Sequence, residues 1–185
     1  DRLEAAYVAN VERSGAKIVR SRAVLEDAHR IRLVKTGEVV RAKYVLIATG
    51  GTPHPGADIA GLEHVISSNE AFHLKELPKR ILIQGGGYIA VEFAGIFHGL
   101  GSEVTLVYRG DNILRGFDDD VRAHVRDEME KNGITILTGC TVDGIEKHDD
   151  WYTSHLSNGS SIASDKVMFA IGRHPAVANL GLEKA

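Results

Sequence analysis

The sequence contains a single cysteine, Cys140, among its 185 residues. One cysteine excludes an internal disulfide framework and any zinc site built from several cysteines. No apolar run approaches the roughly 20 residues needed to cross a bilayer, and the chain does not open on a basic-then-apolar targeting segment. We therefore expect a cytoplasmic protein that is neither secreted nor associated with a membrane.

The sequence also lacks an excess of charge of one sign. Its 22 lysines and arginines nearly balance 25 aspartates and glutamates, so the formal net charge is −3. This balance offers no electrostatic basis for binding nucleic acid. The nine histidines show no H-E-x-x-H or other paired ligand spacing, so we expect no metal site. With 43% hydrophobic and 25% charged residues, the composition is typical of a globular protein rather than a disordered or fibrous one.

Glycine is abundant, with 20 residues, and three consecutive glycines open the segment 85–90, which reads G-x-G-x-x-A. This segment lies between a short apolar run at residues 81–83 and a stretch of helical periodicity at residues 88–100. In dinucleotide-binding loops the glycines permit a tight turn and a close approach of the pyrophosphate, and the small residue lets helix and strand pack closely. Free N–H groups at the helix start then attract phosphate. The context favours dinucleotide binding over a merely flexible turn.

The next expected strand, residues 104–107, indicates which dinucleotide binds. An NAD-binding unit usually places an acidic residue about 20 residues after the glycines, where it holds the ribose 2′-hydroxyl. Here Arg109 follows the strand and Arg115 comes six residues later. Guanidinium groups match the geometry of a 2′-phosphate. Asp111 is an objection unless it caps the loop or pairs with an arginine, and two solvated surface arginines are the alternative. The pattern favours NADPH.

Strands alternate with helices along the chain, which predicts an α/β sheet. The unbroken apolar run at residues 44–47 predicts a strand buried on both faces of a parallel sheet. Residues 142–156 alternate in the manner of an antiparallel meander. For the helix at residues 88–100 we predict a buried face made of Ile89, Phe93, Ile96, Phe97 and Leu100.

Part of this order occurs twice. The segment VLIATGGTP at residues 45–53 matches VMFAIGRHP at residues 167–175, a constant offset of 122 residues. Chance similarity between two strand ends is the alternative. If the repeat is real, the chain carries one complete nucleotide-binding unit and the second half of another, and we expect it to be a piece of a longer protein.

The segments GGGYIAVEFAG, VTLVYRGDNILRGFD, VMFAIGRHP and YVLIATGGTP resemble those of the flavin-dependent pyridine-nucleotide disulfide reductases. The arginine spacing looks most like that of the glutathione reductases among them. The resemblance covers nearly the whole chain and implies a Rossmann-like FAD/NAD(P)-binding fold with antiparallel β-meander insertions. It implies that residues 1–52 form the C-terminal part of an FAD-binding domain and residues 53–175 the NADPH-binding domain. Residues 176–185 would then start the return to the FAD-binding domain.

The resemblance also implies individual cofactor contacts. It places NADPH contacts at Gly85, Gly86, Gly87, Tyr88, Ile89, Glu92, Arg109, Arg115 and Gly172, and FAD contacts at Ala23, Thr49 and Gly50. Tyr88 would cover the nicotinamide pocket and move aside, and Glu92 would face the carboxamide, although both could simply lie on the helix surface. Thr49 and Gly50 could be no more than a strand-ending turn. Gly110 stands where relatives often have a basic residue, which predicts a weaker NADPH preference, and Asn69 stands where they often have Asp.

The resemblance implies a reaction in which NADPH passes a hydride to FAD and the electrons then move to a redox disulfide and on to a small-molecule disulfide. Glutathione disulfide is the expected substrate. The expected assembly is a homodimer. The cysteine pair and acid–base histidine of the family are expected outside this chain. We therefore assign no catalytic residue here and expect the chain alone to be inactive. An NAD(P)H oxidase and a non-catalytic nucleotide-binding module are the alternatives. Cys140, with no basic neighbour, is expected to be a small buried apolar residue.

Overall fold

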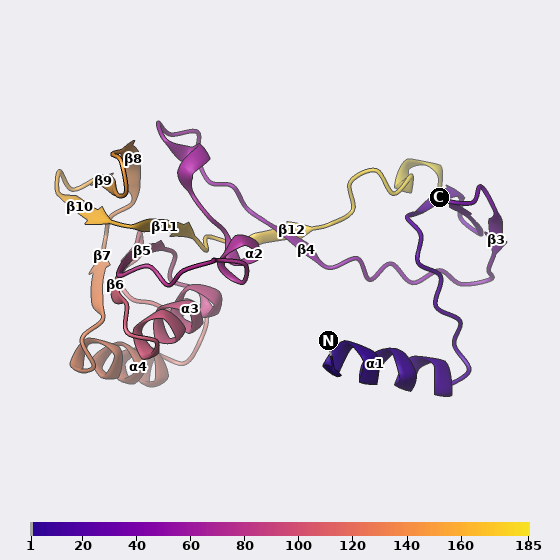
Figure 1. Cartoon of the computed structure of the whole chain (residues 1–185), viewed down its shortest axis with the longest axis horizontal. Helices are drawn as coiled ribbons and strands as arrows, with labels where there is room; N and C mark the ends of the chain where they lie inside the picture. The colour runs from indigo at the N-terminus through magenta and orange to yellow at the C-terminus, as the bar shows by residue number, and fades with distance from the viewer. Residues whose placement is uncertain (1) are drawn as a thin grey trace. The chain divides into compact units, whose positions relative to one another are not determined.

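The computed structural model describes residues 2–185, which divide into two compact units (Figure 1). The larger unit comprises Gly51–His174. The smaller unit combines the residues up to Gly50 with Pro175–Ala185. The range 53–175 expected for a nucleotide-binding domain nearly coincides with the larger unit.

A four-stranded parallel sheet lies at the centre of the larger unit, with the strand order β11-β5-β6-β7. The strands are β5 (Arg80–Gln84), β6 (Glu103–Tyr108), β7 (Thr135–Thr138) and β11 (Lys166–Phe169). Ile81, Leu82 and Ile83 in β5 are each 1% exposed or less. Both faces of the sheet are therefore covered, as an unbroken apolar run predicts for a strand in a parallel sheet.

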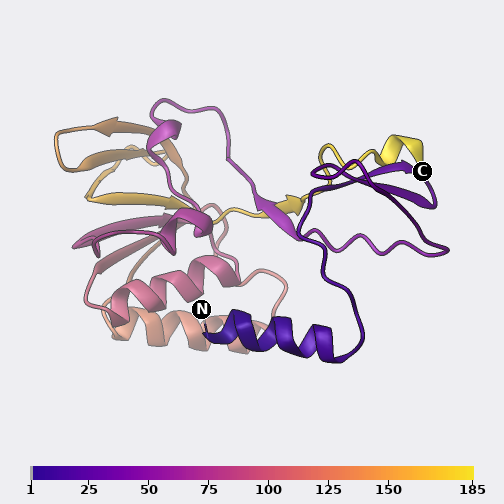
Figure 2. The same cartoon turned by 45° about the vertical axis from the view of Figure 1, so that its right-hand side comes forward.

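Two layers cover this sheet (Figures 1 and 2). On one face lie α3 (Tyr88–Gly99) and α4 (Asp119–Lys131), and on the other lies the antiparallel meander of β8 (Val142–Lys147), β9 (Tyr152–Leu156) and β10 (Ser161–Ser164). Because side chains alternate along a strand, Ile81 and Ile83 pack in the helix-side cluster, whereas Leu82 packs in the meander-side cluster. The predicted α/β class and the predicted meander are both confirmed.

The buried face of α3 differs from the one predicted. Ile96 is 48% exposed and Leu100 is 64% exposed. The helix instead buries a stripe with the helical spacing i, i+3, i+4, i+7, made of Ala90, Phe93, Ala94 and Phe97. The two alanines turn toward the sheet because their small side chains allow a close approach between helix and strand, which leaves the larger Ile96 and Leu100 outside.

Shorter elements complete the larger unit. They are β4 (Gly51–Pro53), η1 (Leu62–His64), α2 (Ser68–Ala71) and the first two residues of β12 (Arg173–Pro175). β4 and β12 form a two-stranded ribbon. Next to it, the N–H of His54 donates to the carbonyl of Gly172 at 2.9 Å. The ends of the two segments that match in sequence are thus joined by backbone hydrogen bonds.

The smaller unit contains a helix and a three-stranded antiparallel sheet of order β1-β2-β3. Its elements are α1 (Arg2–Arg13), β1 (Ala23–Asp27), β2 (Arg30–Leu33), β3 (Val39–Arg41) and η2 (Leu182–Lys184). The C-terminal segment joins this sheet, since the N–H of Leu25 donates to the carbonyl of Leu180 at 2.8 Å. Its buried hydrophobic residues are Leu25, Leu33 and Leu180.

The prediction of a buried strand at residues 44–47 is wrong for this structure. Tyr44 is 82% exposed and Leu46 is 90% exposed, and the segment has no strand conformation. A strand of a parallel sheet needs neighbours that satisfy its backbone hydrogen bonds and layers that cover its faces. No strand among residues 2–185 pairs with this segment, so its apolar pattern does not produce a strand.

β5 and β11 are joined at their amino ends by Arg80 and Asp165. The Arg80 guanidinium donates to the Asp165 carboxylate at 2.7 and 3.2 Å, and the Arg80 backbone N–H donates to the same carboxylate at 2.9 Å. Burial raises the pKa of Asp165, but the hydrogen bonds from Arg80 outweigh it and hold the pKa below its usual value. The carboxylate thus stabilises the pairing of these two strands.

We expect Asp165→Asn to lower the free energy of unfolding of the larger unit by about 1–2 kcal/mol at pH 7. This is less than the usual contribution of hydrogen bonds to a charged group, because the pair is partly exposed to solvent. Because the folded pKa is lowered, this contribution is complete above about pH 4 and disappears as the pH falls through the folded pKa. Urea unfolding, followed by the fluorescence of the single tryptophan, Trp151, should show a difference between wild type and variant at pH 7 that shrinks below pH 4. The exposed Asp149→Asn is the control. An unchanged difference at low pH would contradict the assignment.

Candidate functional site

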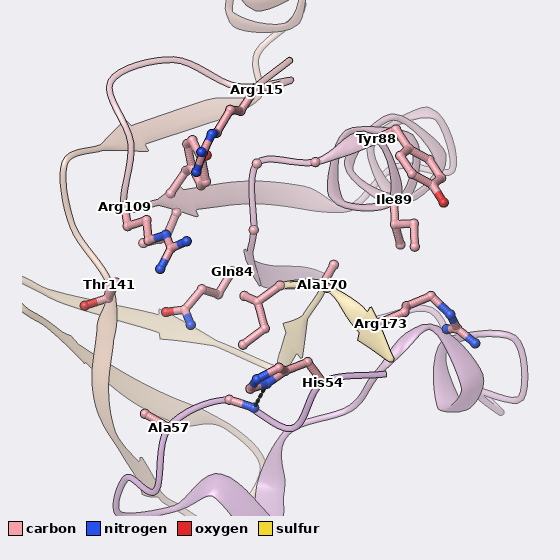
Figure 3. Close-up of a pocket in the computed structure, with 18 residues that line it drawn as sticks. His54, Ala57, Gln84, Tyr88, Ile89, Arg109, Arg115, Thr141, Ala170 and Arg173 are labelled. Atoms are coloured by element: carbon pink, nitrogen blue, oxygen red, sulfur yellow. Dashed lines mark hydrogen bonds between the residues drawn. The ribbon is translucent and has the colours of Figure 1, made fainter. Parts of the chain in front are cut away.

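A cavity of about 790 Å³ lies at the carboxyl end of β5 (Figure 3). Residues that follow β5, β6 and β11 form its wall together with the loop after β4. In open α/β sheets, ligands bind at the carboxyl ends of the strands, and a cavity of this size suits a small molecule or cofactor. The cavity is therefore the candidate site.

Every predicted NADPH contact except Glu92 lines this cavity. Those that line it are Gly85, Gly86, Gly87, Tyr88, Ile89, Arg109, Arg115 and Gly172. Glu92 is exposed on α3, one helical turn after Tyr88, and is not part of the wall. The fold thus gathers residues that are up to 87 positions apart in sequence, from Gly85 to Gly172.

The three glycines differ in what surrounds them. A Cβ on Gly85, whose φ is +147°, would lie 2.3 Å from the carbonyl oxygen of Ala170. A Cβ on Gly86 would lie 2.4 Å from the ring of Tyr108. A Cβ on Gly87 would meet nothing within 4 Å. Packing therefore requires the first two glycines, whereas the space beside the third is open to a ligand.

The same loop leads into the amino end of α3. Gly87 is the N-cap residue, and no side chain caps the helix there. The first N–H groups of a helix have no partner within the helix and carry a partial positive charge. An anionic group in the cavity can accept hydrogen bonds from them, as phosphates do at such helix ends.

Two guanidinium groups in the cavity wall have no partner within residues 2–185. Arg109 and Arg115 form no hydrogen bond or ion pair there. Arg122, outside the wall, is instead paired with Asp119 at 2.6 Å. The carboxylate of Asp111 lies 3.8 Å from the Arg122 guanidinium, so it does not neutralise the two cavity arginines. Both remain available to an anion.

The loop that carries Arg115 is held against the glycines. The N–H of Leu114 donates to the carbonyl of Gly86 at 2.6 Å. Leu114 has a positive φ of 55°, a conformation that is uncommon for a residue other than glycine and often occurs at functional sites. Ile113 and Leu114 are buried, which anchors the loop while Arg115 stays exposed at the cavity.

The two ends of the cavity differ in character. Figure 3 shows Arg109 and Arg115 on one side, and Tyr88, Ile89 and Arg173 on the other. Tyr88 is 57% exposed, so its ring is free to change position. One end of the cavity thus holds two guanidinium groups without a partner among the described residues, and the other holds an exposed aromatic ring beside Arg173, whose guanidinium donates to Ser68 and Gly51.

The three predicted FAD contacts lie in the smaller unit, and all three residues are exposed. Ala23 pairs with Leu33 between β1 and β2. The Thr49 hydroxyl donates to the carbonyl of Ala176 at 2.8 Å, and the N–H of Ala176 donates to the carbonyl of Gly50 at 2.9 Å. These residues are not part of the cavity wall.

Sequence reasoning did not assign ten of the 18 residues in the wall to the site, among them the polar residues His54, Gln84, Thr141 and Arg173. His54 accepts a hydrogen bond at Nδ1 from the N–H of Gly56 at 2.9 Å, drawn as a dashed line in Figure 3. The sequence alone could have pointed to Gln84 as a site residue, because it is a polar residue that ends an apolar strand directly before the glycines. Arg173 directly follows Gly172, which was predicted.

Cys140 is 2% exposed, and burial raises the pKa of its thiol. The prediction of a small buried residue is confirmed.

Within residues 2–185 no group of three or more His, Cys, Asp or Glu side chains is arranged to hold a metal ion. None of the helices in that range has the length and apolarity that crossing a membrane requires.

Comparison with known proteins shows which families the chain is similar to. Glutathione reductase from Burkholderia cepacia is 42% identical over 182 residues, which covers 98% of this chain and 40% of that protein. Trypanothione reductase from Leishmania donovani is 44% identical over 172 residues, which covers 87% of this chain and 35% of that protein. The chain therefore spans about two fifths or less of the length of these curated relatives.

Among solved structures, the HOCl-induced flavoprotein disulfide reductase RclA from Escherichia coli matches with a TM-score of 0.81 and 29% identity, over 92% of this chain and 39% of that one. This match confirms the predicted fold class. The family model described as pyridine nucleotide-disulphide oxidoreductase matches residues 1–185. The resemblance seen in the motifs is thus confirmed: the chain belongs to the pyridine nucleotide-disulphide oxidoreductase family.

Proposed function

We propose that the larger unit binds NADPH in the cavity and serves as the nucleotide-binding part of a flavoprotein disulfide reductase. One observation carries this proposal. Two guanidinium groups without partners among the described residues, those of Arg109 and Arg115, lie in the wall of a cavity that also contains the glycine loop. Guanidinium groups bind phosphate through paired hydrogen bonds, and the 2′-phosphate is the group that distinguishes NADPH from NADH.

The polarity of the cavity sets the orientation of the ligand in this proposal. The glycine loop and the start of α3 hold the pyrophosphate, and the two arginines hold the 2′-phosphate. The nicotinamide then lies toward Tyr88 and Gly172, at the other end of the cavity. Bound NADPH would supply a hydride there, and Tyr88 would limit the access of water. Glu92 lies one helical turn after Tyr88 and outside the cavity wall, so it would have to reach the carboxamide from the surface of α3.

The remaining parts of the proposal concern the whole protein. We propose that Ala23, Thr49 and Gly50 contact FAD, that residues 1–52 and 176–185 belong to the FAD-binding domain, and that the protein is a homodimer. We propose glutathione disulfide as the substrate. The glutathione reductase relative is 42% identical over 98% of this chain, and the trypanothione reductase relative is 44% identical over 87% of it. We choose glutathione because the longer match outweighs the small difference in identity.

A protein that contains this chain should oxidise NADPH when glutathione disulfide is added and should release two equivalents of thiol for each NADPH consumed. Trypanothione disulfide is the comparison substrate. NADPH oxidation that depends on oxygen and not on a disulfide would instead indicate an NAD(P)H oxidase. Binding of NADPH without any oxidation would indicate a non-catalytic module.

For the chain itself, we expect NADPH to bind about 100-fold more tightly than NADH, which corresponds to about 1.4 kcal/mol for each arginine. Isothermal titration with both nucleotides at one fixed ionic strength measures the ratio. The ionic strength must be fixed because salt screens the contacts with phosphate. Equal affinities would contradict the assignment of the two arginines.

A further inference from the structure

Gln84 is the last residue of β5 and directly precedes the glycine loop. Its side chain lies on the meander side of the sheet, since Leu82, two residues earlier, packs in the meander-side cluster. It is 9% exposed, although it follows three fully apolar residues. A buried polar side chain at this position requires an explanation, because polar groups are buried at a cost unless they form hydrogen bonds.

Only the carbonyl oxygen of the Gln84 side-chain amide has a hydrogen-bond partner among the described residues. The N–H of Val142, the first residue of β8, donates a short hydrogen bond to Gln84 Oε1. A backbone N–H can only donate, so the carbonyl side of the amide must face Val142 and the orientation of the group is settled. The amide –NH2 has no partner within residues 2–185. Gln84 also belongs to the cavity wall.

The surroundings of this –NH2 favour an oxygen acceptor supplied by a ligand. No carboxylate of the described residues lines the cavity, whereas three arginines do: Arg109, Arg115 and Arg173. In Figure 3 the Gln84 amide lies within the ring of cavity residues, between Arg109 and His54 in that view. This donor thus faces a cavity whose wall is cationic and holds no carboxylate, a setting that suits an anionic or hydroxyl-rich ligand with oxygen acceptors.

We propose that Gln84 is a nucleotide-binding residue with two functions. Its –NH2 donates a hydrogen bond to a phosphate or ribose oxygen in the diphosphate–ribose part of the bound dinucleotide, and its Oε1 anchors the start of β8. The hydrogen bond to Val142 holds the amide so that the donor faces the cavity before the ligand arrives. This inference rests on the proposed function, because it assumes a dinucleotide in the cavity.

Two substitutions separate the functions. Gln84→Glu keeps an oxygen for the N–H of Val142 but replaces the donor by a second, negatively charged oxygen. Gln84→Met is neutral and of similar length but provides neither donor nor an equivalent acceptor. We expect Gln84→Glu to weaken binding of NADP+ by at least about tenfold, and Gln84→Met to weaken it by about 5–10-fold, the value of one hydrogen bond.

The measurements are isothermal titration with NADP+ and the thermal midpoint of each chain. We expect Gln84→Met to lower the midpoint, because it breaks the bond to Val142. The matched control is Asn158→Asp, which adds the same charge in the meander and keeps the oxygen that accepts from the N–H of Ser160. It should bind NADP+ as the wild type does.

Unchanged NADP+ affinity in Gln84→Glu, with the wild type binding normally, would overturn the role of Gln84 and leave the proposed function intact. An affinity loss in Gln84→Met alone would also overturn it, since that result means that the amide only supports β8. A wild-type chain that binds neither NADP+ nor NADPH would overturn the proposed function and this inference together.

Discussion

The double variant Arg109→Ala, Arg115→Ala should bind NADPH about 100-fold more weakly than the wild type and NADH within about twofold of it. The reason is the isolation of these two guanidinium groups. Neither has a partner within residues 2–185, so neither must break an ion pair before it binds phosphate. Their removal also leaves no buried carboxylate uncompensated, so the fold should remain intact.

The experiment compares NADPH and NADH by isothermal titration for the wild type, both single variants and the double variant. The two single losses should each be about tenfold. The affinity of the wild type for NADPH should fall with added salt more steeply than its affinity for NADH, and the double variant should lose this difference, because exposed charge interactions are screened.

The control for this experiment is Arg20→Ala, Arg41→Ala, which removes two positive charges from the smaller unit and none from the cavity. It should leave both affinities near those of the wild type. If this control weakens NADPH binding as much as the cavity variant does, the effect comes from net charge, and the two arginines do not form a phosphate site.

The glycine loop and its strands could be predicted because their signals are local. The segment 85–90 sets a turn and a helix start through residues that are adjacent in sequence, and the short apolar run of β5 directly precedes it. Arg109 and Arg115 were predicted in the same way, from their place after the next strand, and both lie in the cavity wall. The residues from which we propose the chemistry of the site therefore lie in short stretches of sequence.

Other features depend on partners that are distant in sequence. The face of α3 was predicted wrongly because a pattern of large apolar residues ignores Ala90 and Ala94, which turn inward only because the sheet lies close to them. Residues 44–47 have the pattern of a buried strand but no pairing strand among the described residues. The orientation of the Gln84 amide depends on a hydrogen bond from Val142, 58 residues later in the sequence.

Alanine substitutions at the first and third glycines of the loop should have different effects: the first should destabilise the fold, and the third should weaken NADPH binding. Gly85→Ala should lower the free energy of unfolding of the larger unit by about 3 kcal/mol or more, because a forced contact with backbone and a strained φ add together. The new Cβ would lie 2.3 Å from the carbonyl oxygen of Ala170, at a φ of +147°. Urea unfolding followed by Trp151 fluorescence measures this loss.

Gly87→Ala should instead fold with a loss of about 1 kcal/mol or less, the usual effect of an alanine at an N-cap position. Its φ is −83° and its Cβ would meet nothing within 4 Å, so the added methyl group enters only the space beside the loop. If the pyrophosphate lies there, NADPH binding should weaken by at least about tenfold. Gly95→Ala, at an equally open position in α3, is the matched control and should bind NADPH normally. Normal NADPH binding by Gly87→Ala would mean that the pyrophosphate does not approach the loop at this residue.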